Sequence, residues 1–382
     1  MQRSQRRENE QEMYSSLPLA DMRVVTIGGG TGPFALLSTL KHYPCSITAI
    51  VSMADSGGSS RRLMDEFGQL PFGDLRQALV ALSRKGLLWR NVFAYRFQRG
   101  KSDQPRKPPA LAVGSQGSAN LEQAGVAGHS LGNLIISALQ NLNDDNLLHA
   151  LGDAQELLNT AGRVLPITLA HSTLCAELAD GTIVCGETEI DTRGADNTTS
   201  LAPIRRVFLR EPVPACEEAI RAIHRADVII IGPGDLYTSI LPNLLVGGVA
   251  DAIRKSEARC VYVCNLMTKH GETDGFRASD FVREIHHYLG RSVDRVILHD
   301  GTLPEHLVDR YAARQQFPVE ADVANVEALV PEVITSQLLA VHGDHLVRHN
   351  ADRLLRAIFT PVGFEPSVGI QAERMATTHA EA

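Results

Sequence analysis

Long apolar runs are missing from this sequence. No stretch reaches the roughly 18 to 20 apolar residues that a transmembrane helix requires, because the longest candidates are broken by Gly, Pro or charge. The first 16 residues are polar and charged and contain no apolar core of a secretory signal. We therefore expect no membrane span, a cytoplasmic location, a disordered leader over residues 1–21 and a loose tail over residues 361–382.

An excess of positive charge is also missing. The formal net charge is −7 at pH 7, which argues against a general binder of nucleic acid or of anionic membranes. A local basic pocket, such as Arg61 with Arg62, is still compatible with this charge. With 382 residues, of which 44% are hydrophobic, the chain can bury a full core as one large domain or two of ordinary size.

Metal-ligand spacing is absent from the cysteines. The six cysteines show no C-x-x-C pair, and several lie in apolar strand-like runs, where a thiol packs as a small hydrophobic group. We expect core packing rather than metal binding or disulfides. Four residues near the C-terminus have zinc-like spacing, but Gly343 would break a helix there, so we expect solvated surface histidines. These four residues are His342, Asp344, His345 and His349.

What the sequence does have is three glycine-rich turns, each after a short apolar run. They are Gly28–Gly32, Asp55–Ser60 and Gly232–Asp235. Glycine lets backbone N–H groups approach an anion closely, and a following helix adds the positive end of its dipole. If the three turns meet along the carboxyl edge of one parallel sheet, they form a crevice sized for a nucleotide or a sugar diphosphate.

The first turn matches neither of the two common nucleotide motifs. In G-x-G-x-x-G, aligned on Gly28 and Gly30, the third position holds Pro33, which can still begin a helix but alters the close contact between helix and strand. No Gly-Lys-Ser or Gly-Lys-Thr follows, so the lysine of a Walker loop is missing. A standard NAD site and ATP hydrolysis by a Walker loop are therefore not expected.

Two aspartates near the second turn are candidates for chemistry. Asp55 ends an apolar strand, and Asp74 stands at a probable helix start in Gly73-Asp74-Leu75-Arg76. Asp74 can be a helix N-cap or a metal ligand, and the spacing favours neither. If the two carboxylates converge, they can share a magnesium ion that bridges phosphates.

A segment that matches the nucleophile elbow of α/β hydrolases occurs at Gly128–Gly132. That motif, G-x-S-x-G, would make Ser130 a nucleophile and needs a strand immediately before it. A Gly-, Ser- and Gln-rich stretch precedes it instead, and helical spacing follows. We therefore expect His129 and Ser130 to begin a helix, with Asn133 one turn on.

The order of apolar patterns predicts an α/β fold: a Rossmann-like, doubly wound, mostly parallel sheet with an inserted antiparallel meander. We expect one domain over residues 22–360, with a flexible insertion at 100–128. Asp180-Gly181 is the expected hairpin turn of the meander. Its expected strands are 164–170, 174–179, 182–187 and 204–209. Helices are expected at 34–41, 75–84, 131–142, 147–161, 216–225, 249–255 and 279–289, and further strands at 24–27, 47–53, 228–231, 259–265 and 295–299.

Six motifs together resemble the gluconeogenesis factor family, the YvcK-like proteins, over about residues 22 to 360. The family is similar in fold to 2-phospho-L-lactate transferase, CofD. The resemblance implies a UDP-sugar-binding regulator without established turnover, required for cell shape and wall synthesis during growth on gluconeogenic carbon sources. It also implies cell-wall synthesis proteins and further copies of the chain as partners. The motifs are Ile27–Gly32, Ala54–Ser60, Gly73–Arg76, Gly128–Asn133, Gly232–Ser239, and Cys264–Thr268 with Gly271–Thr273.

The alternative is a CofD-like transferase, in which a metal on Asp55 and Asp74 neutralises a diphosphate while an acceptor hydroxyl attacks phosphorus. Two departures bear on this choice. Ser56 stands where relatives usually have a second aspartate, and Phe276 stands where a tyrosine associated with UDP-sugar binding is expected. Mg²⁺ is the one cofactor that this alternative implies. The candidate ligand-binding residues are Gly29, Gly30, Thr31, Gly32, Asp55, Gly57, Gly58, Ser59, Ser60, Arg61, Asp74, Arg76, His129, Asn133, Gly232, Gly234, Asp235, Tyr237, Thr238, Asn265, Thr268 and Phe276.

Overall fold

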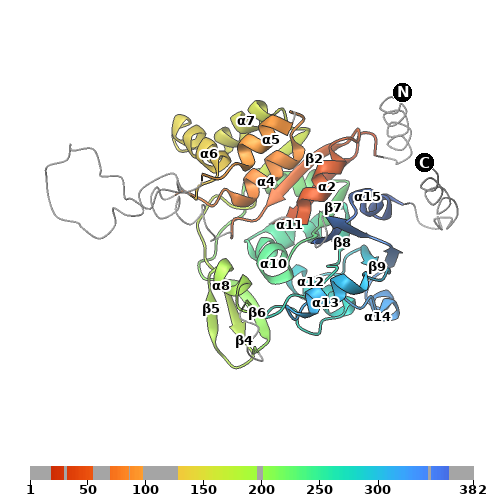
Figure 1. The fold of residues 1–382 in the computed structure, drawn as a ribbon. Helices are drawn as coiled ribbons and strands as arrows, with labels where there is room; N and C mark the ends of the chain where they lie inside the picture. Colours follow the sequence, from red (N-terminus) through yellow and green to blue (C-terminus); the bar gives the residue numbers. More distant parts are fainter. Residues whose placement is uncertain are drawn as a thin grey trace, which may run out of the picture.

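A seven-stranded parallel sheet forms the centre of the computed structural model, which describes residues 19–29, 32–54, 69–85, 87–97, 128–195, 201–342 and 346–360 (Figure 1). The strand order is β10-β9-β8-β7-β1-β2-β3. Most of its strands are apolar on both faces, as expected for a sheet covered by helices on both sides. The strands are β1 (Arg23–Gly28), β2 (Ser46–Val51), β3 (Gly162–Pro166), β7 (Val228–Ile231), β8 (Arg259–Val263), β9 (Arg295–His299) and β10 (Glu332–Ser336).

The order in which successive strands join the sheet reverses next to β1. From β1 the chain proceeds outward through β2 to β3, and it then returns to β7 on the other side of β1. Strand β1 pairs in parallel with both neighbours, with Gly28 opposite Val51 and Ile27 opposite Ile231. The connections after β1 and β7 therefore diverge at the carboxyl edge and open a crevice between them. The predicted doubly wound sheet is confirmed.

Helices cover both faces of this sheet. Helix α2 packs against α4 and α15, whereas α11 packs against α9 and α12. The connections β1–β2 and β7–β8 run in opposite directions along the sheet, so right-handed crossovers place α2 and α11 on opposite faces. Among the described residues no helix is both long and apolar enough to cross a membrane. The helices are α2 (Gly32–Leu40), α4 (Gly73–Leu82), α5 (Leu87–Ala94), α6 (Leu131–Leu142), α7 (Leu147–Leu158), α8 (Glu187–Asp191), α9 (Glu217–Arg225), η1 (Leu236–Ile240), α10 (Leu241–Leu245), α11 (Val249–Lys255), α12 (Ala278–Leu289), α13 (Glu305–Ala312), α14 (Val323–Glu327) and α15 (Ala351–Phe359).

The inserted antiparallel sheet has three strands rather than the four expected. Its order is β5-β4-β6, and Figure 1 shows it with α8 beside the main sheet. The segment expected as its first strand is instead β3, which pairs in parallel with β2 because its apolar end, Val164 and Leu165, is buried on the main sheet. The Asp180-Gly181 hairpin is confirmed: Asp180 accepts a hydrogen bond from the Thr182 N–H, and Gly181 has a φ of 87°. The three strands are β4 (Leu174–Leu178), β5 (Ile183–Cys185) and β6 (Ile204–Leu209).

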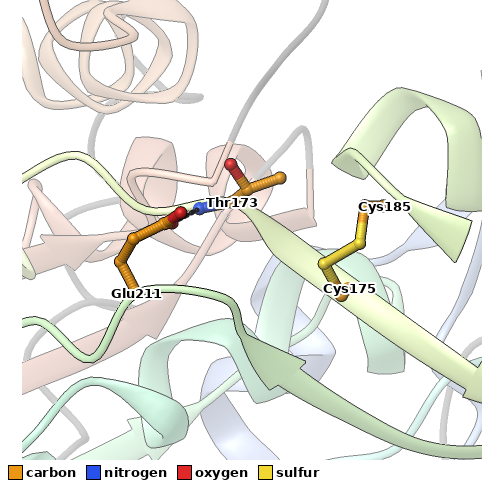
Figure 2. Close-up of a disulfide and its surroundings, with 4 residues drawn as sticks. All are labelled: Thr173, Cys175, Cys185 and Glu211. Atoms are coloured by element: carbon orange, nitrogen blue, oxygen red, sulfur yellow. Dashed lines mark hydrogen bonds between the residues drawn. A yellow bond between two sulfur atoms is a disulfide. The ribbon is translucent and has the colours of Figure 1, made fainter. Parts of the chain in front are cut away.

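A disulfide joins two strands of the small sheet, and the expectation that all six cysteines are unpaired is wrong. Cys175 and Cys185 lie directly opposite each other on β4 and β5, with 4.1 Å between their Cα atoms (Figure 2). The same strand is anchored at its start, where the Thr173 N–H donates to a carboxylate oxygen of Glu211 at 3.1 Å. Apolar patterns describe each strand separately, so they did not reveal that the two thiols face each other. The other four cysteines are free, and three of them are buried.

Apart from the strand at Val341-His342, which the sequence favours over a helix, the elements after β9 were not predicted. They are β10, the hairpin of β11 (Leu339–His342) and β12 (Leu346–His349), and α13 to α15. Strand β10 is fixed by Arg295, whose fully buried guanidinium donates to both carboxylate oxygens of Glu332 at 2.7 Å. The helices and strands predicted earlier in the chain are present with shifted ends. The second glycine turn, the tail, and nearly all of the leader and the insertion lie outside the described residues.

Candidate functional site

The first and third glycine turns touch each other at the carboxyl ends of β1 and β7. A Cβ atom on Gly32 would lie 2.1 Å from the carbonyl oxygen of Pro233 and 2.9 Å from Cα of Gly234. Such distances leave room only for hydrogen, so the N-terminus of α2 and the third turn can meet only because glycine stands at 32. The predicted convergence of these two turns is confirmed, whereas Gly30, Thr31 and the whole second turn lie outside the described residues.

Asn265, at the end of β8, holds the third turn in place. Its Nδ2 atom donates to the carbonyl oxygen of Gly234 at 2.9 Å. Gly232 has a φ of 82°, a backbone conformation that favours glycine, and its N–H donates to the Ile27 carbonyl oxygen of β1. Three neighbouring strands therefore fix the shape of one turn, which can present its backbone to a ligand with little reorganisation.

Asp74 lies at the same edge, but it is not a helix N-cap. The N-cap of α4 is Phe72, and Asp74 belongs to the first helical turn. Its carboxylate lies against the first turn, since Oδ2 would be 2.6 Å from a Cβ atom on Gly29. The cap interpretation is thus wrong, and the ligand interpretation stays a prediction, because Asp55 lies outside the described residues. No step through a metal on this pair is derived.

The Gly128–Gly132 segment begins helix α6, as expected, and is no nucleophile elbow. Ser130 is the N-cap, with its hydroxyl oxygen accepting from the Asn133 N–H at 3.2 Å. The Asn133 side-chain oxygen in turn accepts from Nε of Arg76 at 2.9 Å, which joins α6 to α4. His129 is buried next to this cap. The structure therefore brings together three of the predicted site residues, as a polar contact between two helices.

A cavity of about 400 Å³ opens where the first and third turns meet. Six predicted residues line it, and they are Gly29, Gly32, Gly234, Asp235, Asn265 and Thr268. The lining residues that were not predicted are Glu187, Asp191, Pro233, Ser239, Leu266, Met267, Lys269, Tyr311, Gln316, Val347, Arg348 and His349. A larger cavity of about 910 Å³ lies between α7 and β3, and its described lining includes no residue of the first or third glycine turn, so the smaller one is the better candidate site.

Some predicted residues support the cavity without lining it. Tyr237 is buried in η1, and its ring packs edge-on against Phe276 at 6.4 Å between centroids. Phe276 continues this stack to Phe281 at 5.5 Å. Thr238 is buried and donates to Glu272 at 3.4 Å. The side chains of Tyr237, Phe276, Phe281 and Thr238 therefore belong to the packing behind the cavity.

The wall of the cavity contains an ionic cluster centred on Lys269. Its Nζ lies 2.8 Å from Asp235 and 3.0 Å from Glu272, and it also binds Asp191 at the end of α8. Oxygen atoms of the three carboxylates lie within 4.8 Å of one another. Two carboxylates at that distance repel by roughly 3 kcal/mol at an effective dielectric constant of about 20, so the ammonium is what allows them to converge.

Burial and the neighbouring charges shift the pKa values of this cluster. Burial alone would lower the pKa of Lys269, but the carboxylates of Glu272, Asp235 and Asp191 raise it above its ordinary value, so the ammonium stays charged. Burial acts to raise the pKa of Glu272, and the adjacent ammonium of Lys269 opposes this by favouring the charged carboxylate. Sequence reasoning missed Lys269 and Asp191 because their contact spans 78 positions and follows no local motif.

His349 lines the cavity, and the expectation that it is a solvated surface residue is wrong. Its Nε2 lies 3.2 Å from the carbonyl oxygen of Cys264, which can only accept, so Nε2 carries the hydrogen and Nδ1 is left as an acceptor. Burial lowers the pKa of His349 to about 4, which keeps the ring neutral. His345 lies outside the described residues, as does Asp344.

Comparison with known proteins agrees with this fold. The family model described as 2-phospho-L-lactate transferase CofD matches residues 24–339. A gluconeogenesis factor of Halalkalibacterium halodurans is 40% identical over 337 residues, which cover 88% of this chain and 95% of the relative. A gluconeogenesis factor of Bacillus subtilis is 37% identical over 334 residues, which cover 87% of this chain and 95% of that relative.

A crystal structure of a protein from Bacillus halodurans has the same fold. It has a TM-score of 0.78 and 39% sequence identity to this chain, and the match covers 88% of this chain and 99% of that one. The residues that the family model matches span the main sheet from β1 to β10 and include the first and third glycine turns. The chain therefore belongs to the gluconeogenesis factors, in the family of 2-phospho-L-lactate transferase CofD.

Proposed function

We propose that this chain is a UDP-sugar-binding regulator, in which the glycine turns hold the diphosphate. The observation that carries the proposal is the contact of α2 with the third turn, where Gly32 and Gly234 bring two backbones together at the reversal of strand order. The first turn of α2 contains no acidic side chain, so the positive end of its dipole is available to an anion. The diphosphate lies at this end of the cavity.

The cellular role follows from the family. Its relatives are gluconeogenesis factors, and the motif resemblance supports a part in cell shape and wall synthesis during growth on gluconeogenic carbon sources. We place the protein in the cytoplasm, where UDP-sugars are made, as a homo-oligomer that signals to cell-wall synthesis proteins. Binding itself is the output, so saturable binding without turnover is the expected behaviour.

The test is calorimetric titration with UDP-N-acetylglucosamine, UDP-glucose, NAD, GDP and ATP, each with and without Mg²⁺. Selective binding of a UDP-sugar is expected. In Gly234→Val the new side chain meets Cβ of Ser239, which is 3.2 Å from a Cβ atom at 234, and fills the space of a phosphate, so binding is lost. Gly152→Ala on α7, where the added Cβ meets nothing within 4 Å, is the matched control and binds normally. Unchanged affinity in Gly234→Val removes this turn from the site.

A CofD-like transferase is the second candidate, favoured by the Asp74 carboxylate against Gly29 at the carboxyl edge. This function requires Mg²⁺-dependent product formation from a nucleotide-linked substrate. Asp74→Asn then abolishes turnover while a regulator retains part of its UDP-sugar affinity. If the wild-type protein forms product and Asp74→Asn does not, the transferase replaces the regulator as the proposed function.

A further inference from the structure

Three chain segments bring one carboxylate each to a cluster beside the cavity. Asp191 ends α8 and Asp235 ends the third turn, and both line the cavity, whereas Glu272 lies between β8 and α12 and is buried next to them. Their oxygen atoms lie within 4.8 Å of one another, with the ammonium of Lys269 bound to all three. The ammonium donates hydrogen bonds to Asp191 and Asp235, and its contact with Glu272 at 3.0 Å is an ion pair.

Glu272 carries an acceptor that the ammonium does not satisfy. Its side chain is 1% exposed, and its Oε2 atom is buried without a hydrogen-bond partner among the described residues. A carboxylate oxygen left in this way is costly, because it has lost water and gained no donor. A metal ion can bind both oxygens of one carboxylate, whereas the lysine reaches one.

We propose that Asp191, Asp235 and Glu272 form a site for a hard divalent cation, such as Mg²⁺, Ca²⁺ or Mn²⁺, whose place in this chain is taken by the ammonium of Lys269. The donor set is oxygen only, which these ions prefer. Lys269 is thus a tethered cation that fastens α8 to the third turn. This inference concerns the wall of the ligand cavity and does not depend on which ligand the cavity takes.

The test removes the tethered cation and offers a free one. Lys269→Ala is titrated with Mn²⁺ and followed by electron paramagnetic resonance and calorimetry, without any nucleotide. We expect one Mn²⁺ more per chain than in the wild-type protein, with a dissociation constant on the order of 10⁻⁴ M and at least about tenfold tighter than any wild-type binding at this place. Mn²⁺ bound elsewhere is common to all variants and cancels in the comparison.

Two further variants locate the added ion. Lys255→Ala removes an exposed lysine from α11 and should bind Mn²⁺ as the wild-type protein does. Lys269→Ala with Asp191→Asn removes one ligand and should lose the added ion. Failure of Lys269→Ala to gain Mn²⁺, or a gain that survives Asp191→Asn, overturns the proposal.

Folding of Lys269→Ala supplies a second readout, because three converging carboxylates without a cation repel one another. We expect a lowered thermal midpoint that millimolar Mn²⁺ restores in this variant and leaves unchanged in Lys255→Ala. If the variant is unfolded without metal, Mn²⁺ should fold it, as measured by circular dichroism. A variant that Mn²⁺ does not stabilise contradicts the site, whereas a loss of UDP-sugar binding alone concerns the proposed function.

Discussion

Replacing Gly32 by alanine tests whether the contact between the first and third turns is as close as the structure has it. The added methyl carbon would lie 2.1 Å from the Pro233 carbonyl oxygen and 2.7 Å from its carbonyl carbon. To restore an ordinary contact the two turns must separate by about 1 Å, and no side chain can rotate away because both atoms are backbone. Overpacking of this kind costs about 1 to 3 kcal/mol, and we expect the upper end here.

Gly152→Ala is the matched substitution with the opposite expected sign. Gly152 lies in the middle of α7, and a Cβ atom there meets nothing within 4 Å. Alanine is better than glycine in a helix interior by about 0.5 to 1 kcal/mol, so this variant should be stabilised. The two variants make the same chemical change and should differ by about 3 to 4 kcal/mol in free energy of unfolding.

Urea unfolding followed by circular dichroism measures this difference. The midpoint should fall for Gly32→Ala and rise for Gly152→Ala, with the slope of each transition unchanged if the substitutions act on the native state. Titration with UDP-N-acetylglucosamine on the same samples should show weaker binding in Gly32→Ala alone. Equal midpoints in the two variants would refute the close approach of the turns and, with it, the shape proposed for the diphosphate site.

Three other perturbations have directions that the structure fixes. Arg295→Met removes the buried partner of Glu332, which keeps its ion pair with Arg259, and it removes the donor to the Ile358 and Thr360 carbonyl oxygens. The free energy of unfolding should fall by about 3 kcal/mol, the lower end for a broken buried pair, measured in urea. Reduction of the Cys175–Cys185 disulfide, whose sequence separation is 10, should lower the free energy of unfolding by roughly 2.7 kcal/mol. A Cys175→Ser control should not respond to dithiothreitol. Burial lowers the pKa of His349 to about 4 in the native state, so as the pH falls below 6.5 the unfolded chain binds a proton that the native protein does not. The free energy of unfolding should therefore fall by up to about 3 kcal/mol as the pH drops from 6.5 to 4. A His349→Phe variant should lack this part of the pH dependence.

Local sequence patterns predicted those parts of the fold whose cause is local. Ser130 begins α6 because a hydroxyl accepts the N–H of the residue three positions on, a relation visible in the sequence. The strands before the first and third turns are apolar on both faces, which indicated a covered parallel sheet. Such a sheet brings both turns to its carboxyl edge, and the pairing of β7 with β1, which the sequence did not predict, then brings Gly32 against Pro233.

Contacts between distant segments could not be predicted in this way. The bond between Lys269 and Asp191 spans 78 positions, and that between Lys269 and Asp235 spans 34. Asp191 does not differ in its sequence neighbourhood from a surface acid, and the glycine turn that singled out Asp235 gave no sign of Lys269 as its partner. The disulfide required the register of β4 on β5, because a shift of one residue would turn Cys175 and Cys185 to opposite faces.

The distribution of charge along the cavity limits which ligand fits it. The N-terminus of α2 and the third turn present backbone N–H groups and a helix dipole, which favour an anion. Directly beside them, the cluster that begins at Asp235 and includes Asp191 and Glu272 has three acidic side chains for the single ammonium of Lys269, which favours hydroxyl donors and repels a further anion. A ligand with charge along its whole length, such as a nucleoside triphosphate, would meet repulsion at this cluster. The proposed ligand, a diphosphate joined to a neutral sugar, carries its charge on two phosphates only and has hydroxyl groups to offer to the carboxylates.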